Sequence, residues 1–244
     1  MLKNYVRLPL ENAYNARDLG GYPCEGGVTA WRVFIRSDGL ESLSAGDVRF
    51  LSEYGVKHVI DLRTPGELLA APDPQALKSA MGYRNIPLMS GEVADATRAG
   101  VSLAEAPSDF LPEFYISLLR DGRDTIREIM GAMASAGNGG VVFHCAAGKD
   151  RTGVVAALLL GAAGVCREDI LANYEVTHTY LRRNAAMMGS AEGYPPELMQ
   201  SRASSLGRAL GYIGTEHGGI PQYLLAAGVT RAQLGEIVGR FVAR

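Results

Sequence analysis

Cysteine is scarce in this chain, which carries only Cys24, Cys145 and Cys166 among its 244 residues. Three cysteines at such distant positions exclude a disulfide framework and a cysteine-rich zinc cluster. A chain without disulfides fits a reducing compartment, so we expect a cytoplasmic protein. Export without a cleavable signal stays open, because it would leave no mark in the sequence.

Long apolar runs and an excess of charge of one sign are also lacking. The strongest apolar run, 154–165, is too short to cross a bilayer, and the first residues do not form the apolar core of a signal peptide. The net charge is only −2, which gives no general attraction to nucleic acid or to anionic membranes. We therefore expect no nucleic-acid partner and no integral membrane contact.

Apolar residues make up 47% of the chain and charged residues 20%, which is typical of a globular protein. Short β-branched or aromatic runs alternate with segments of helical periodicity, and this predicts an α/β domain with a mainly parallel central sheet flanked by helices. The expected strands are 33–35, 58–60, 83–88 and 141–143, with none after Val165. The expected helices are 44–54, 108–121, 122–133, 154–163, 168–181, 196–210 and 230–241.

Local signals mark several of these boundaries. Ser44 is a helix cap, Thr230 begins a capping-box pattern, and Asp121-Gly122 is expected to divide one periodic segment into two helices. No internal repeat or low-complexity linker divides the chain. Residues 183–219 carry paired methionines, glycines and Pro195-Pro196, and are expected to form a mobile insertion over the core.

The most informative stretch is the polar loop 144–153, with the sequence His-Cys-Ala-Ala-Gly-Lys-Asp-Arg-Thr-Gly. Successive backbone N–H groups of such a loop can form an anion-binding nest, and the helix that follows adds a positive dipole end. Both effects favour the thiolate of Cys145, which is the nucleophilic form. Ala146, Ala147 and Gly148 are small enough for the backbone to close around a phosphate, and Arg151 offers a planar fork to two of its oxygens.

These residues predict an enzyme in which Cys145 attacks a phosphomonoester and the loop stabilises the transferring phosphoryl group. Thr152 is expected to hydrogen-bond the sulfur and ease its departure. His144 is expected to fix the loop through its ring nitrogens. Lys149 either binds a second phosphate or is an exposed charge that raises the local potential.

The pattern His-Cys-(five residues)-Arg-Thr-Gly resembles the signature of the protein tyrosine phosphatase superfamily. The fuller form, His-Cys-x-x-Gly-Lys-Asp-Arg-Thr-Gly, is similar to that of a bacterial branch of atypical tyrosine/dual-specificity phosphatases. Three further segments resemble that branch in the same order: Asn15 to Gly21, Phe34 to Ser37, and Asp61-Leu62-Arg63 followed by Glu67. The resemblance implies one phosphatase domain over 1–244, no metal or other cofactor, a helical lid at 183–219, and hydrolysis through a cysteinyl phosphate.

The resemblance leaves the general acid open. Many members of the superfamily use an Asp on a separate loop well before the cysteine, where Asp109 lies, with Asp121 and Asp124 nearer. The pattern Cys-x-x-Gly-x-Asp-Arg also resembles myotubularin-type lipid phosphatases, in which the loop Asp is the proposed acid. Because an acid must reach the leaving oxygen, we predict Asp150 as the acid and Asp61 as the second candidate, unless Asp61 merely pairs with an Arg.

Phosphotyrosine is the leading expected substrate, with phosphoserine and phosphothreonine also in range. Lys149 resembles the loop Lys of phosphoinositide phosphatases related to tensin, so a phosphoinositide-preferring lipid phosphatase is an alternative. Two other classes stay open. One is a non-catalytic phosphate-binding module, which would be expected to have lost the cysteine, the arginine or the acid. The other is a rhodanese-like sulfur transferase, which also places a loop cysteine after a strand.

Overall fold

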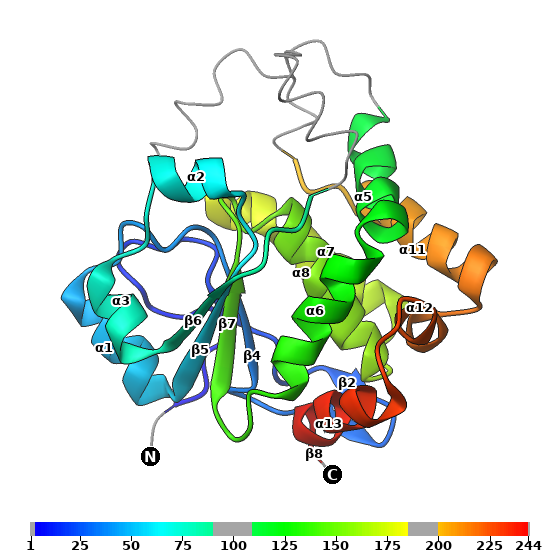
Figure 1. Ribbon diagram of the computed structural model, residues 1–244, viewed down its shortest axis with the longest axis horizontal. Helices are drawn as coiled ribbons and strands as arrows, with labels where there is room; N and C mark the ends of the chain where they lie inside the picture. The colour runs from blue at the N-terminus through cyan, green and yellow to red at the C-terminus, as the bar shows by residue number, and fades with distance from the viewer. Residues whose placement is uncertain (1–2, 90–108, 185–199, 244) are drawn as a thin grey trace.

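A five-stranded sheet forms the centre of the protein. The computed structural model describes residues 3–89, 109–184 and 200–243 (Figure 1). Its strands are β1 (Arg17–Asp18), β4 (Phe34–Ser37), β5 (Val56–Asp61), β6 (Gly82–Asn85) and β7 (Gly140–His144). They lie in the order β1-β4-β7-β5-β6. The strands β4, β7, β5 and β6 are parallel to one another, and β1 is antiparallel to β4. The predicted mainly parallel sheet is confirmed.

Helices cover both faces of the sheet, as Figure 1 shows. Neighbouring strand residues point to opposite faces, so Ile35 and Val142 pack in one apolar cluster while Phe34 and Phe143 pack in another. The smaller cluster lies under α1 (Ala45–Tyr54) and α3 (Gln75–Ala80). The helices of the larger layer are α5 (Phe110–Asp121), α6 (Arg123–Ala134), α7 (Asp150–Ala162), α8 (Arg167–Leu181), α11 (Ala203–His217), α12 (Ile220–Ala226) and α13 (Arg231–Phe241).

Several helix boundaries follow local signals in the sequence. The predicted cap at Ser44 starts α1, where Asp47 completes a capping box, and the predicted capping box at Thr230 starts α13. Gly122 separates α5 from α6, also as predicted. A third capping box, at Thr64, starts α2 (Pro65–Ala70) directly after β5. This short helix is not predicted from periodicity, because none of its residues is buried.

The prediction of no strand after Val165 is wrong. The short strand β8 (Val242–Ala243) pairs with β3 (Gly27–Thr29), which in turn pairs with β2 (Pro23–Cys24). This small sheet brings the C-terminal residues of the described chain against residues 23–29. Strands of two or three residues carry too little pattern to be recognised locally, and β8 pairs with a segment more than two hundred residues away.

The helix expected over 196–210 is found in part: α11 spans Ala203–His217, residues 200–202 are not helical, and residues 196–199 lie outside the described residues. Leu206, Ala209 and Ile213 of α11 are buried in the main core. This part of the expected insertion 183–219 therefore belongs to the packed layer, since apolar spacing outweighs the glycines. Residues 185–199 of that expected lid lie outside the described residues.

The helices can also be compared with the thickness of a bilayer. Within the described ranges, none of them is both long enough and apolar enough to serve as a membrane span.

Candidate active site

The loop that carries Cys145 leaves the central strand β7 and enters α7. Residues 145–151 are called the Cys145 loop below. Helix α7 begins at Asp150, so it starts inside the segment 144–153 that was expected to be loop throughout. Cys145 is 2% exposed at the carboxyl end of β7, between the parallel neighbours β4 and β5. This edge of a parallel sheet is where ligands of α/β proteins bind.

The carbonyl groups of the Cys145 loop are held from its outer side. The Ala146 carbonyl accepts a hydrogen bond of 2.8 Å from the Gly39 N–H. The Asn15 side-chain amide donates to the carbonyls of Ala147 and Gly148, at 3.1 and 3.0 Å. Arg36 Nη2 donates to the Gly148 carbonyl at 2.7 Å. These bonds fix the orientation of three successive peptide units.

The N–H groups of the same peptide units therefore face the inner side of the loop, because the N–H and C=O of a trans peptide point in opposite directions. Over the part of the chain that the structure describes, no backbone N–H from Ala146 to Thr152 forms a hydrogen bond. Gly148, Lys149 and Thr152 are buried, and buried backbone donors rarely stay unpaired in proteins. A run of them around a cysteine is the arrangement of an anion-binding nest.

Gly148 is required by the shape of the loop. Its φ angle is +63°, a region that residues with a side chain rarely adopt. A Cβ atom at this position would lie 2.3 Å from the Ser37 carbonyl oxygen. The loop is therefore closed tightly against the end of β4.

Arg151 is held at the loop by a carboxylate that comes from α2. Its Nη1 and Nη2 atoms donate to the two oxygens of Glu67, each at 2.7 Å. Glu67 is itself fixed, because it completes the capping box with Thr64. Burial alone would raise the pKa of Glu67, but the hydrogen bonds from Arg151 lower it to about 2. The pair is therefore charged throughout the neutral range, and the guanidinium fork is held in one orientation.

Replacing Glu67 with glutamine tests this positioning of Arg151. The neutral amide keeps one acceptor but loses the two-pronged ion pair, so Arg151 should no longer be held in one place. We expect kcat/KM for an aryl phosphate to fall about tenfold or more. Glu53→Gln, an exposed change in α1, is the matched control and should leave kcat/KM unchanged. An unaltered kcat/KM in Glu67→Gln would show that the pair does not position Arg151 for the reaction.

Asp150 is fixed by contacts on one of its two oxygens. Its Oδ1 accepts hydrogen bonds from the Tyr115 hydroxyl at 2.5 Å and from Lys149 Nζ at 2.7 Å. Tyr115, from α5, also contacts the Tyr174 hydroxyl of α8 at 2.5 Å. Among the described residues no group donates to Oδ2, and the Asp150 side chain is 23% exposed. One carboxyl oxygen is thus anchored and the other is left for a partner.

Asp61 has a different environment from Asp150. It is fully buried and accepts hydrogen bonds from Arg63 and from the Tyr83 hydroxyl. Burial would raise the pKa of Asp61, but the bonds from Arg63, the nearby His144 and the Tyr83 bond together lower it to about 2. A group that is ionised at neutral pH is unsuited to give a proton to a leaving group. The geometry therefore favours the alternative interpretation of Asp61, a carboxylate paired with an Arg.

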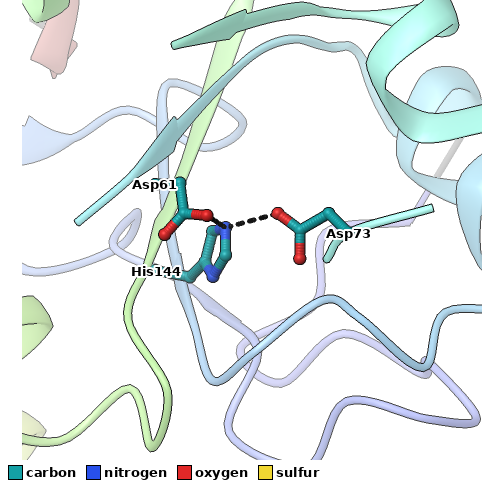
Figure 2. Close-up of side chains that lie close together, drawn as sticks. All are labelled: Asp61, Asp73 and His144. Atoms are coloured by element: carbon teal, nitrogen blue, oxygen red, sulfur yellow. Dashed lines mark ion pairs between the residues drawn. The ribbon is translucent and has the colours of Figure 1, made fainter. Parts of the chain in front are cut away.

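Asp61, Asp73 and His144, the residue before Cys145, form a buried cluster. Figure 2 shows their three side chains close together. Asp61 ends β5 and is the register partner of His144, while Asp73 lies between α2 and α3. The His144 Nε2 atom lies 3.2 Å from Asp73 Oδ2 and 3.8 Å from Asp61 Oδ2, close enough for ion pairs but not aligned for hydrogen bonds. The other ring nitrogen, Nδ1, lies 3.3 Å from the Cys145 carbonyl oxygen. The ring is thus confined between the loop and two carboxylates.

The same three residues offer donor atoms that lie within 4.8 Å of one another, a spacing that can hold a metal ion. Arg63, however, donates to both carboxylates, with Nη2 at 2.8 Å from Asp61 Oδ2 and from Asp73 Oδ1. A divalent cation at this point would lie against a buried guanidinium. The donor set therefore does not favour a metal, and the cluster is better described as an ion-pair network that orients His144.

The remaining candidates take other places. Thr152 Oγ1 is buried without a partner among the described residues, so the expected bond to the sulfur is not formed here. Lys149 is 4% exposed, so the interpretation as an exposed charge is wrong. Asp121 and Asp124 pair with neighbouring arginines, and Asp109 lies just before α5, at the edge of the described residues.

Sequence reasoning gave no role to the residues that support the loop. Asn15, Arg36 and Glu67 stand in segments that resemble the phosphatase branch, so the resemblance could have identified them as candidates. Asp73 and Tyr115 gave no such signal, because Tyr115 fits the apolar face of a helix and Asp73 lies in an irregular segment.

The fold and the site together are typical of a protein that binds phosphate between a loop cysteine and an arginine held by an ion pair. Comparison with known families agrees. The model of the tyrosine phosphatase family matches residues 8–243, and the chain belongs to this family. It is accordingly a phosphatase.

Individual relatives support the same assignment. The chain is 32% identical to a tyrosine-protein phosphatase of Nostoc commune, over 84% of this chain and 72% of that protein. It is 32% identical to a candidate tyrosine-protein phosphatase of Cupriavidus necator, over 97% of this chain and 88% of that protein. A more distant relative is the triple specificity protein phosphatase PtpB of Mycobacterium tuberculosis, 24% identical over 94% of this chain and 97% of that protein. The predicted resemblance to the bacterial branch is confirmed.

Proposed function

We propose that this phosphatase hydrolyses phosphotyrosine in proteins through a phosphorylated Cys145. The observation that carries the proposal is that the backbone N–H groups from Ala146 to Thr152 form no hydrogen bond within the described residues, and that those of residues 147–149 face the inner side of the loop. Such donors stabilise the three equatorial oxygens of a transferring phosphoryl group without having to reorganise. Arg151 adds a guanidinium that is already held at the same loop by Glu67.

In the first step the Cys145 thiolate attacks phosphorus and the bond from phosphorus to the tyrosyl oxygen breaks. That oxygen takes a proton from Asp150, which is adjacent to Arg151 and has one carboxyl oxygen free of described contacts. In the second step water attacks the phosphorylated cysteine and gives a proton to the Asp150 carboxylate. The S–P bond breaks, the thiolate returns and inorganic phosphate leaves.

The position of Lys149 bears on the range of substrates. Its ammonium group pairs with Asp150 at 2.7 Å, so a second substrate phosphate would have to compete with that carboxylate. We therefore place phosphotyrosine ahead of phosphoinositides. Phosphoserine, phosphothreonine and phosphoinositides stay within the proposal because PtpB, a relative, is described as a triple specificity phosphatase.

The test is hydrolysis of a phosphotyrosyl peptide in the presence of EDTA. We expect phosphate release, loss of activity with orthovanadate, and a phosphoryl group on the Cys145 peptide when single turnovers are quenched with acid and analysed by mass spectrometry. The same protein incubated with thiosulfate and cyanide should form no thiocyanate. Binding of phosphotyrosine without phosphate release would instead indicate a non-catalytic module, and thiocyanate formation would indicate a sulfur transferase.

A further inference from the structure

Arg36 is a buried guanidinium without a carboxylate beside it. It belongs to β4 and its exposure is 0%. Its Nη1 atom donates to the Asn173 side chain at 2.8 Å and its Nη2 atom to the Gly148 carbonyl at 2.7 Å, while Nε has no partner among the described residues. In the same part of the chain no Asp or Glu forms an ion pair with it. Because a buried charge is costly unless it is compensated, a counter-charge is expected nearby.

Cys145 is the group that meets this need. It follows β7, the parallel neighbour of β4, and Arg36 donates a hydrogen bond to the Gly148 carbonyl of the Cys145 loop. Burial lowers the pKa of Arg36 to about 10 and the neighbouring Cys145 raises it. Arg36 therefore remains a cation at neutral pH, on the strand beside the one that leads into the loop cysteine.

We propose that Arg36 is the buried counter-charge of the Cys145 thiolate and a positioning residue of the Cys145 loop. It lies on the carbonyl side of Gly148, whereas a substrate phosphate would bind on the N–H side. The assignment depends on the proposed function in one respect, which is that the nucleophile is a thiolate. Negative charge stays near the sulfur when the thiolate becomes a phosphorylated cysteine, so a fixed cation on this side suits both states.

The neighbouring Arg17 provides an internal comparison. It is also buried and belongs to the same hydrogen-bond network, since it donates to Asn15 and to the Asn173 carbonyl. Within the described residues Arg17 makes no hydrogen bond to the Cys145 loop itself, because it donates to Asn15, Asn173 and Thr177. Loss of Arg17 should therefore disturb the network without removing the cation that faces the sulfur.

The experiment measures how much of Cys145 is thiolate as a function of pH, from the ultraviolet absorbance of the thiolate. Each protein is compared with the same protein carrying Cys145→Ser, so that the other thiols and the tyrosines cancel. Arg36→Gln removes the charge but keeps a donor for the Gly148 carbonyl, and Arg36→Lys keeps the charge. We expect the midpoint of the Cys145 titration to rise by about one pH unit or more in Arg36→Gln. At a fixed pH below the midpoint this is about a tenfold loss of thiolate.

Arg36→Lys and the control Arg17→Gln should keep midpoints near that of the unchanged protein. Arg151, the other cation that acts on Cys145, is retained in every variant. If Arg36→Gln does not fold, Arg36→Met replaces it, because a buried site often accepts an apolar side chain of similar size in place of a charge. An uncharged variant that is folded and has an unmoved midpoint would overturn the proposal, as would equal shifts in the Gln and Lys variants.

The readout separates this proposal from the proposed function, because thiolate formation is measured without substrate. A protein that hydrolyses no phosphotyrosine but shows the expected shift in Arg36→Gln would retain the assignment of Arg36 and lose the proposed activity. An active protein whose midpoint does not move would retain the activity and lose the assignment.

Discussion

Replacing Cys145 with serine is expected to lower kcat for a phosphotyrosyl peptide by at least ~10³-fold. The reason is that a serine hydroxyl is far less ionised than a thiol at neutral pH, so the loop no longer holds an anionic nucleophile. The backbone N–H groups and Arg151 remain, because none of them depends on the sulfur. The variant should therefore still bind phosphotyrosine, and steady-state kinetics with isothermal titration calorimetry would measure both effects.

Cys166→Ser is the matched control for this substitution. Cys166 is an exposed cysteine at the N-cap of α8, away from the Cys145 loop, and serine is a favourable residue at a helix N-cap. Its activity should equal that of the unchanged protein. Turnover of Cys145→Ser near the level of this control, in a preparation free of other phosphatases, would contradict a mechanism that uses Cys145 as the nucleophile.

The central part of the site could be predicted from sequence because its residues are contiguous. From Cys145 to Arg151 the chain runs from the end of a buried strand into a helix. Local geometry alone therefore predicts a loop around the cysteine, a helix dipole that points at it and an arginine at the end of the loop. Helix starts at Ser44 and Thr230 were predictable for the same reason, since a capping box involves four neighbouring residues.

The supporting residues could not be predicted in this way because they reach the site through tertiary packing. Asn15 and Gly148 are separated by 133 positions, and Arg151 and Glu67 by 84. Each of these contacts forms only when β4, β5 and β7 lie side by side, and no local sequence pattern specifies that arrangement. Asp73 is the clearest case, because its only role in the structure is within a buried cluster formed by three distant segments.

The structure also changes the weight of the acid candidates. Sequence spacing left Asp150, Asp61 and Asp109 open. The pKa of Asp61, lowered to about 2, makes it a poor proton donor at neutral pH. Asp150 is anchored through one oxygen by Tyr115 and Lys149, and lies beside the arginine that would hold the phosphate. This arrangement makes a sharp experiment possible.

Asp121→Asn is the matched control for replacing Asp150 with asparagine. Asp121 was among the candidates by sequence spacing, but its carboxylate pairs with Arg120 at the end of α5, at 2.9 Å. Removing its charge should leave the rate unchanged for every leaving group. Each variant would be assayed with a series of aryl phosphates whose leaving-group acidity varies.

Asp150→Asn is expected to slow aryl phosphates with poor leaving groups by about 10² to 10⁴-fold, the usual contribution of a general acid. Phosphates with good leaving groups should be slowed far less, because such a group departs without a proton. The basic limb of the pH–rate profile should also flatten, since that limb reports loss of the proton from the acid. If Asp150→Asn instead lost the same factor for all leaving groups and kept its basic limb, Asp150 would act only by holding Lys149 and the loop. The proton would then have to come from another group, and Asp109 would be the next residue to replace.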